Sequence, residues 1–253
     1  MDFSIFTPFD LSTWQWIVWF GFGLSVGLTK TGFSGLSAAI IPFIAIIFGA
    51  RQSTGLLLPV LCFADILAVV YYHRHSEIKY VFKLIPWTVA GFALAILVDS
   101  IIPVQAFKYF MGGCILVGLI IMIWNENMRK NLPPHSSWWF SAIFGIAGGF
   151  STMFGNVAGP IMAVFLLSMR LPKNSFVGTT AWFFLIVNLL KLPIMIFVWK
   201  TISVQTLLFD LTQIPMVVAG AGLGIFLIKK ISESLFRKII IILTLMSTVL
   251  LFI

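Results

Sequence analysis

Residues 27–35, GLTKTGFSG, interrupt the first hydrophobic segment of the chain with small and polar side chains, and Pro42 follows. Residues 148–156, GGFSTMFGN, interrupt a later hydrophobic segment in a similar way, and Pro160 follows. An irregular backbone at membrane depth is tolerated only where protein or a water-filled cavity surrounds it. Two such breaks at matching places in two halves of a chain indicate the substrate site of a transporter.

The composition places the chain in a lipid bilayer. Of its 253 residues 60% are hydrophobic and 9% are charged, which excludes a soluble domain. We predict an all-α polytopic membrane protein, because most of its apolar segments are long enough to cross a bilayer. The segments that flank the two breaks are shorter. The ten segments run roughly over 14–29, 33–50, 55–72, 81–98, 104–124, 138–150, 153–169, 176–199, 211–228 and 235–253.

The chain also repeats itself. We expect a first transmembrane repeat over residues 1–124, a cytoplasmic linker over 125–137 and a second repeat over 138–253. Each repeat would hold a broken or re-entrant helix pair followed by three long transmembrane helices. Shared apolar composition would not place proline, glycine and a basic pair in the same order, so we infer a duplication. The matched positions are Pro42 and Pro160, Gly55 and Gly178, Asp65 and Asn188, Ile85-Pro86 and Ile214-Pro215, Gly91 and Gly220, and Phe107-Lys108 and Phe236-Arg237.

The basic residues predict the orientation. With both termini placed on the periplasmic side, eleven lysines and arginines fall in cytoplasmic loops and three fall outside, which is a strong positive-inside bias. An odd number of crossings in each half then makes the second half inverted relative to the first. One kinked helix in place of each short pair would instead make the halves parallel. These loops also account for the net charge of +8, so we expect no nucleic-acid partner.

The breaks carry groups that suit an anion. A helix that begins at a break would point unpaired N–H groups and a positive dipole end at a ligand. A lysine inside hydrocarbon is costly unless it faces a cavity, a partner or the interface. The alternatives are that the lysine reaches the outer surface and that the hydroxyls serve helix packing and capping. The predicted substrate-binding residues in the breaks are Lys30, Thr31, Gly32, Ser34, Ser151, Thr152 and Asn156.

Three further polar residues lie inside long apolar runs. Asn188 and Lys191 are three residues apart on one helical face, and we predict that both bind the substrate. Asp65 occupies the place that matches Asn188, and it would either carry a proton or form a structural ion pair with a lysine. The chain has no phosphate-binding loop and no cluster of metal ligands, so we expect no cofactor, no metal and no enzyme activity.

These stretches resemble the TauE/SafE family of sulfite and organosulfonate exporters. The resemblance rests on residues 28–42, on residues 151–160 and above all on residues 176–193, FVGTTAWFFLIVNLLKLP. The first stretch departs from the common family form, which has a run of glycines where this chain has Lys30 to Gly35. The chain looks like a lysine-bearing branch, which leaves the identity of the anion open.

The resemblance implies export of sulfite or a small organosulfonate across the bacterial inner membrane. We predict a secondary transporter that works by alternating access, with proton coupling and a homodimer as open questions. The alternatives are an anion channel of the same fold and a transporter of another small anion.

Overall fold

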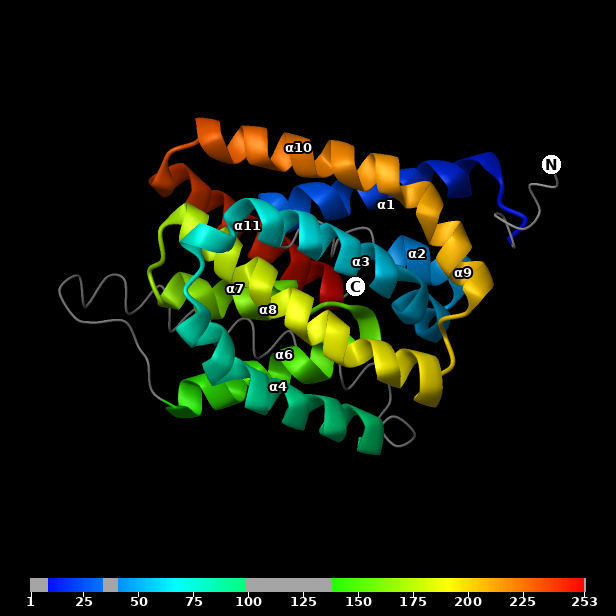
Figure 1. Cartoon of the computed structure of the whole chain (residues 1–253), viewed down its shortest axis with the longest axis horizontal. Helices are drawn as coiled ribbons and strands as arrows, with labels where there is room; N and C mark the ends of the chain where they lie inside the picture. The colour runs from blue at the N-terminus through cyan, green and yellow to red at the C-terminus, as the bar shows by residue number, and fades with distance from the viewer. Residues whose placement is uncertain (1–8, 34–40, 99–137, 253) are drawn as a thin grey trace.

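The computed structural model describes residues 9–33, 41–98 and 138–252, and these ranges fold into helices joined by short connections (Figure 1). No strand occurs in those ranges. The predicted segment 104–124 and the linker 125–137 lie outside the described residues. Four helical stretches are long and apolar enough to cross a membrane, namely Gln52–His75, Ile78–Val98, Lys173–Val198 and Val204–Lys230.

The first two helices lie next to each other on the way to the long helix α3 (Ala50–Tyr72). Helix α1 (Thr13–Thr31) begins at Ser12, whose backbone N–H donates to the Gln15 Oε1 atom at 2.8 Å. Helix α2 (Ile41–Phe48) ends beside the first half of α1, since the Phe48 ring lies 5.5 Å from the Trp19 ring. The chain therefore returns toward the start of α1 before α3 begins.

The sixth and seventh helices form a hairpin. Helix α6 (Trp138–Gly155) and helix α7 (Gly159–Ser168) run antiparallel, because the Phe140 and Phe165 rings stack at 5.7 Å while the three connecting residues 156–158 join their other ends. Phe140 and Phe165 are both buried, so the hairpin closes on its own apolar side chains.

Both predicted breaks begin later in the chain than we expected. Helix α1 continues to Thr31 and helix α6 continues to Gly155, so residues 27–31 and 148–155 are helical. The glycines inside these stretches serve close packing instead of breaking the helix. A Cβ atom at Gly27 would clash with the Val217 carbonyl, and one at Gly149 would clash with the Thr88 carbonyl.

The remaining helices carry two local distortions. Helix α8 (Lys173–Pro193) continues from Pro193 into a π-helical turn, η4 (Ile194–Val198). Helix α9 (Val204–Asp210) passes through a 3₁₀ turn, η5 (Leu211–Gln213), into helix α10 (Ile214–Lys230). Helix α4 (Ile78–Val98) follows α3 after a 3₁₀ turn, η3 (His73–His75), and helix α11 (Glu233–Phe252) ends the described chain.

The tightest packing joins the two halves of the chain. Helix α1 lies along α10, and α4 lies along α6, with α3 and α8 between these pairs (Figure 1). Both outer pairs are parallel. Gly27 packs on Val217 and Gly32 packs farther along on Gly224, while Gly145 packs on Leu84 and Gly149 packs farther along next to Gly91. Helices α3 and α8 are antiparallel, because Asp65 contacts Asn188 whereas Tyr72 contacts Gly178.

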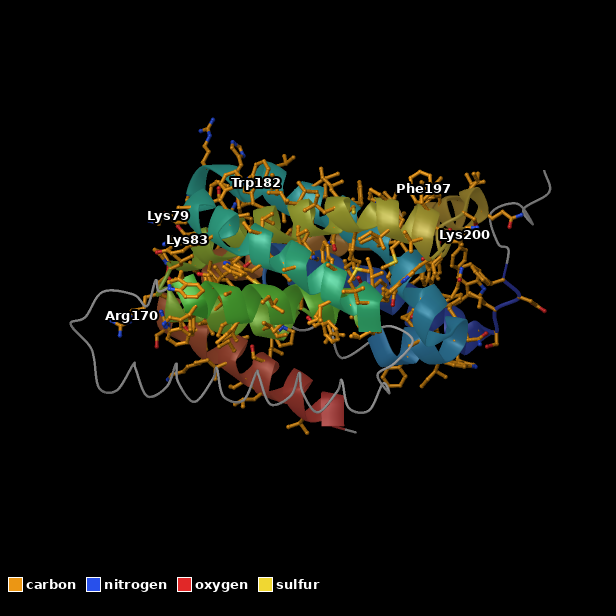
Figure 2. All side chains as sticks on the ribbon, turned by 90° about the horizontal axis from the view of Figure 1, so that it is seen from below. Lys79, Lys83, Arg170, Trp182, Phe197 and Lys200 are labelled. Carbon is orange, nitrogen blue, oxygen red and sulfur yellow. The ribbon has the colours of Figure 1, made fainter. Side chains whose placement is uncertain are left out.

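Much of the outer surface is apolar, as a lipid-facing surface should be. Large hydrophobic side chains such as Val70, Phe82, Leu97 and Phe197 are more than half exposed. Basic residues lie at the two ends of the helices instead. Figure 2 shows Lys79, Lys83 and Arg170 at one end and Lys200 at the opposite end. This distribution agrees with a multi-pass membrane protein.

We predict that Gly220→Ala destabilises the protein, because a Cβ atom there would clash with the Leu24 carbonyl on α1. The expected loss is about 1–3 kcal/mol in the free energy of unfolding, the usual cost of overpacking. Gly222→Ala is the matched control in the same helix, since a Cβ atom at Gly222 meets no atom within 4 Å. Thermal unfolding of the purified variants in detergent measures both. Equal melting temperatures for the two variants would contradict close packing of α1 on α10.

Candidate functional site

The predicted polar residues gather where the ends of α1 and α6 meet the middle of α3 and the second half of α8. At the first of these places the Lys30 Nζ atom lies 2.8 Å from the Asp65 Oδ1 atom. Lys30 is 8% exposed and Asp65 is fully buried. The Lys30 ammonium also lies 4.1 Å from the centre of the Phe184 ring, a cation–π distance. Lys30 therefore turns into the protein and does not reach for the outer surface.

Asp65 and Asn188 contact each other directly. The Asn188 Nδ2 atom donates to the Asp65 Oδ2 atom at 2.7 Å, and both side chains are buried. The repeat in the sequence matches these same two residues. The matched positions therefore lie at the crossing of α3 and α8, and one carboxylate receives a lysine from α1 and an amide from α8. This ion pair is the structural alternative that we considered for Asp65.

Lys191 occupies the other end of the cluster. It is fully buried, and its Nζ atom donates to the Thr152 carbonyl at 2.6 Å and to the Asn156 Oδ1 atom, with the Thr152 hydroxyl at 3.4 Å. These partners are neutral oxygens. No carboxylate of the described residues lies within ion-pair distance of Lys191. The cluster thus holds two ammonium groups and one carboxylate, and Lys191 is the charge without a counterion.

Asn156 explains why α6 ends where it does. Its backbone has a φ of 55°, the left-handed conformation that ends helices and that asparagine tolerates. Its backbone N–H donates to the Thr152 carbonyl at 3.1 Å, and its Nδ2 atom donates to the Thr54 carbonyl on α3 at 3.1 Å. The side chain therefore joins α3, α6 and Lys191 at one point.

The helix ends differ from the arrangement that we expected. Lys30, Thr31, Ser151 and Thr152 lie toward the carbonyl ends of their helices, and not at helix starts with free N–H groups. Such an end favours cations, which explains why the Lys191 ammonium binds the end of α6.

The hydroxyls of the breaks bond mainly to backbone carbonyls. The Ser151 hydroxyl donates to the Gly148 carbonyl at 2.9 Å. The Thr31 hydroxyl lies 2.9 Å from both the Gly27 carbonyl and the Ala221 carbonyl of α10. These contacts are the packing and capping role that we kept as the alternative. Gly32 packs against Gly224, and Ser34 lies outside the described residues.

Two residues of the cluster were not among the predicted ones. Phe184 covers Lys30, and its place four residues before Asn188 on the same helical face was the available signal. Tyr72 donates its hydroxyl to the Thr31 carbonyl at 3.0 Å. The position of Tyr72 at the end of α3 did not predict this contact. Among the described residues no group of three or more histidine, cysteine or carboxylate side chains could hold a metal ion.

The fold and the site define a multi-pass membrane protein with a buried, positively charged centre. The family model "Sulfite exporter TauE/SafE" matches residues 19–251, nearly the whole chain. The chain belongs to this family and is a membrane transporter, as the resemblance implied. In comparisons with curated proteins and with solved structures, no match was found.

We predict that Lys30 and Asp65 depend strongly on each other. Lys30→Met or Asp65→Asn alone should lower the free energy of unfolding by about 3–5 kcal/mol, because each leaves a buried charge without its partner. The double variant should lose clearly less than the sum of the two single losses.

The exposed pair of Lys79 and Glu77, 3.0 Å apart, provides the control. Lys79→Met should leave the melting temperature unchanged, because water screens surface ion pairs. Additive losses in the Lys30 and Asp65 double variant would contradict a direct interaction.

Proposed function

We propose that the chain exports sulfite or a small organosulfonate across the bacterial inner membrane. Lys191 carries this proposal. A fully buried ammonium that contacts only neutral oxygens is costly in an apolar surrounding, and an anion would neutralise it. Family membership supports the choice of a small sulfur oxyanion.

The groups around Lys191 suit an anion with several oxygens. We propose that the ligand displaces the Thr152 carbonyl from the ammonium and accepts hydrogen bonds from Lys191, from the Thr152 hydroxyl and from the Asn156 amide. Asn188 and Lys30 would complete the site from the side of α3. Thr31, Gly32 and Ser151 would contribute only after the ends of α1 and α6 rearrange, because Thr31 and Ser151 donate to the backbone and Gly32 packs against Gly224. Ser34, outside the described residues, stays a predicted contact.

We further propose that residues 1–124 and 138–253 are inverted repeats. The direction of the matched helices supports this. Helices α3 and α8 contain the matched pairs Gly55 and Gly178, and Asp65 and Asn188, yet they run antiparallel. The first helix of each half packs in parallel on a later helix of the other half, α1 on α10 and α6 on α4. Alternating access would then be a rocking of these crossed pairs around the central cluster.

The anion site is tested by thermal unfolding of the purified protein with sulfite, sulfate, thiosulfate, sulfoacetate, taurine and carboxylate analogues at fixed ionic strength. A ligand of the folded state raises stability by about 2.7 kcal/mol at a hundred times its Kd. We expect saturable stabilisation by sulfite or a sulfonate that Lys191→Gln removes.

Lys200→Gln, which changes an exposed lysine at one end of the protein, is the matched control and should keep the stabilisation. Stabilisation that persists in Lys191→Gln would leave Lys191 as a cap of α6 only. The absence of stabilisation by every anion would contradict the proposed substrate class.

The orientation is tested by labelling single cysteines in a background with Cys62 and Cys114 replaced. We expect Ser234→Cys to react with a membrane-impermeant reagent only from the cytoplasmic side. Lys200→Cys should react only from the periplasmic side. Both positions are exposed, so access does not limit the reaction. Labelling of Ser234→Cys from the periplasm would overturn the topology.

A further inference from the structure

A second buried carboxyl lies away from the lysine cluster. Asp210, the last residue of α9, is 6% exposed, and neither of its carboxyl oxygens accepts a hydrogen bond. Asp65 differs, since it has both Lys30 and Asn188 as partners. A buried carboxyl without a partner favours its neutral form, because burial removes the water that stabilises the ionised form and no protein donor replaces that water.

The neighbouring side chain of Gln213 offers what a protonated carboxyl needs. Gln213 is 1% exposed, and its Nε2 atom donates to the Trp19 carbonyl at 2.7 Å. This bond fixes the amide and leaves the Oε1 atom without a donor. Asp210 and Gln213 are three residues apart across the 3₁₀ turn η5, a spacing that brings side chains to one face. A proton on Asp210 would supply the missing donor.

The surroundings of Asp210 contain little that could stabilise its charge. Phe209 and Trp19, whose rings stack at 4.5 Å, belong to the apolar cluster between α1, α3 and α9. Helix α9 packs on α3, and η5 packs on α1 and α10. The charged residues of these elements are Lys30, Arg51, Asp65, Lys229 and Lys230. The side chain of Arg51 lies outside the described part of the structure.

Of these charges, the four whose side chains the structure describes are paired with each other or distant. Lys30 and Asp65 form their own ion pair. Lys229 and Lys230 lie at the far end of α10, about 24 Å along the helix from Gln213 by the helical rise. No ion pair joins Asp210 to a basic residue in the described structure.

Asp210 also lies at a hinge. Pro215 has no N–H to bond the Leu211 carbonyl, which accepts instead from the Ile214 N–H in the 3₁₀ turn. A 3₁₀ turn between two helices is a common hinge. Helix α10 is held on α1 through Gly220 and Gly224, so a movement at η5 would displace α9 relative to α10.

We propose that Asp210 is the proton-binding site that couples this transporter to the proton gradient. The carboxyl holds a proton while α9 covers it, and it releases or takes up the proton from water when movement at η5 exposes it. The coupling role rests on the proposed transport function, whereas the protonation itself does not.

Infrared spectroscopy of the protein in lipid tests the protonation without any substrate. The wild type at neutral pH should show the C=O stretching band of a protonated carboxyl. Asp210→Asn should lose this band and Asp210→Glu should shift it. Glu77→Gln, which changes an exposed carboxyl, is the control that should keep it. An unchanged band in Asp210→Asn would overturn the proposal. A wild-type protein that lacks the band, and whose folded state sodium stabilises only when Asp210 is present, would overturn it as well.

Reconstituted vesicles with an internal pH-sensitive dye test the coupling. An imposed sulfite gradient should move protons in the wild type, and Asp210→Asn should lose this proton movement while anion flux continues. Proton movement equal to that of the wild type in Asp210→Asn would overturn the coupling role. If the wild type moves no tested anion, the proposed transport function fails, and the infrared result still decides whether Asp210 binds a proton.

Discussion

Helices that end inside an apolar medium leave carbonyl groups that water cannot reach, and this constraint organises the centre of the protein. Helices α1 and α6 both end there. The Thr31 carbonyl accepts from the Tyr72 hydroxyl of α3, and the Thr152 carbonyl accepts from the Lys191 ammonium of α8. Each of these two helix ends is thus satisfied by a long helix, so α1, α6 and the α3–α8 pair stabilise one another.

This arrangement places a lysine where the proposed function needs one. An ammonium that only satisfies helix-end carbonyls could be replaced by a neutral donor, as Tyr72 shows at the end of α1. Lys191 instead places an ionisable amine where the described structure offers no carboxylate partner, next to the Asn156 side chain. In the proposed site, carbonyl groups and an anion would compete for the Lys191 amine. Anion binding would therefore loosen the end of α6, which links ligand binding to movement of the hairpin.

Sequence reasoning recovered much of the fold and named polar residues that gather at its centre, with errors of a physical kind. The apolar segments located most of the described helices but not α9, and the membership in the TauE/SafE family is confirmed. Glycine was misread, since Gly27 and Gly149 sit inside helices where neighbouring backbones approach closely. A sequence cannot separate a glycine that breaks a helix from one that lets two helices touch. Asp210 was missed for a similar reason, because its lack of partners is a property of the packed structure.

The sequence by itself determined the membrane class, the family and the burial of Lys30, Asp65, Asn188 and Lys191, because hydrophobicity and charge are properties of the residues themselves. It also matched Asp65 with Asn188 before any contact was known. Only the tertiary structure decided which charges neutralise each other. Lys30 rather than Lys191 pairs with Asp65, since α1 ends beside the middle of α3 while Lys191 points to the end of α6. These side-chain partners are 35 residues or more apart in the chain, so their contacts depend on how the helices cross. The local sequence does not specify that crossing.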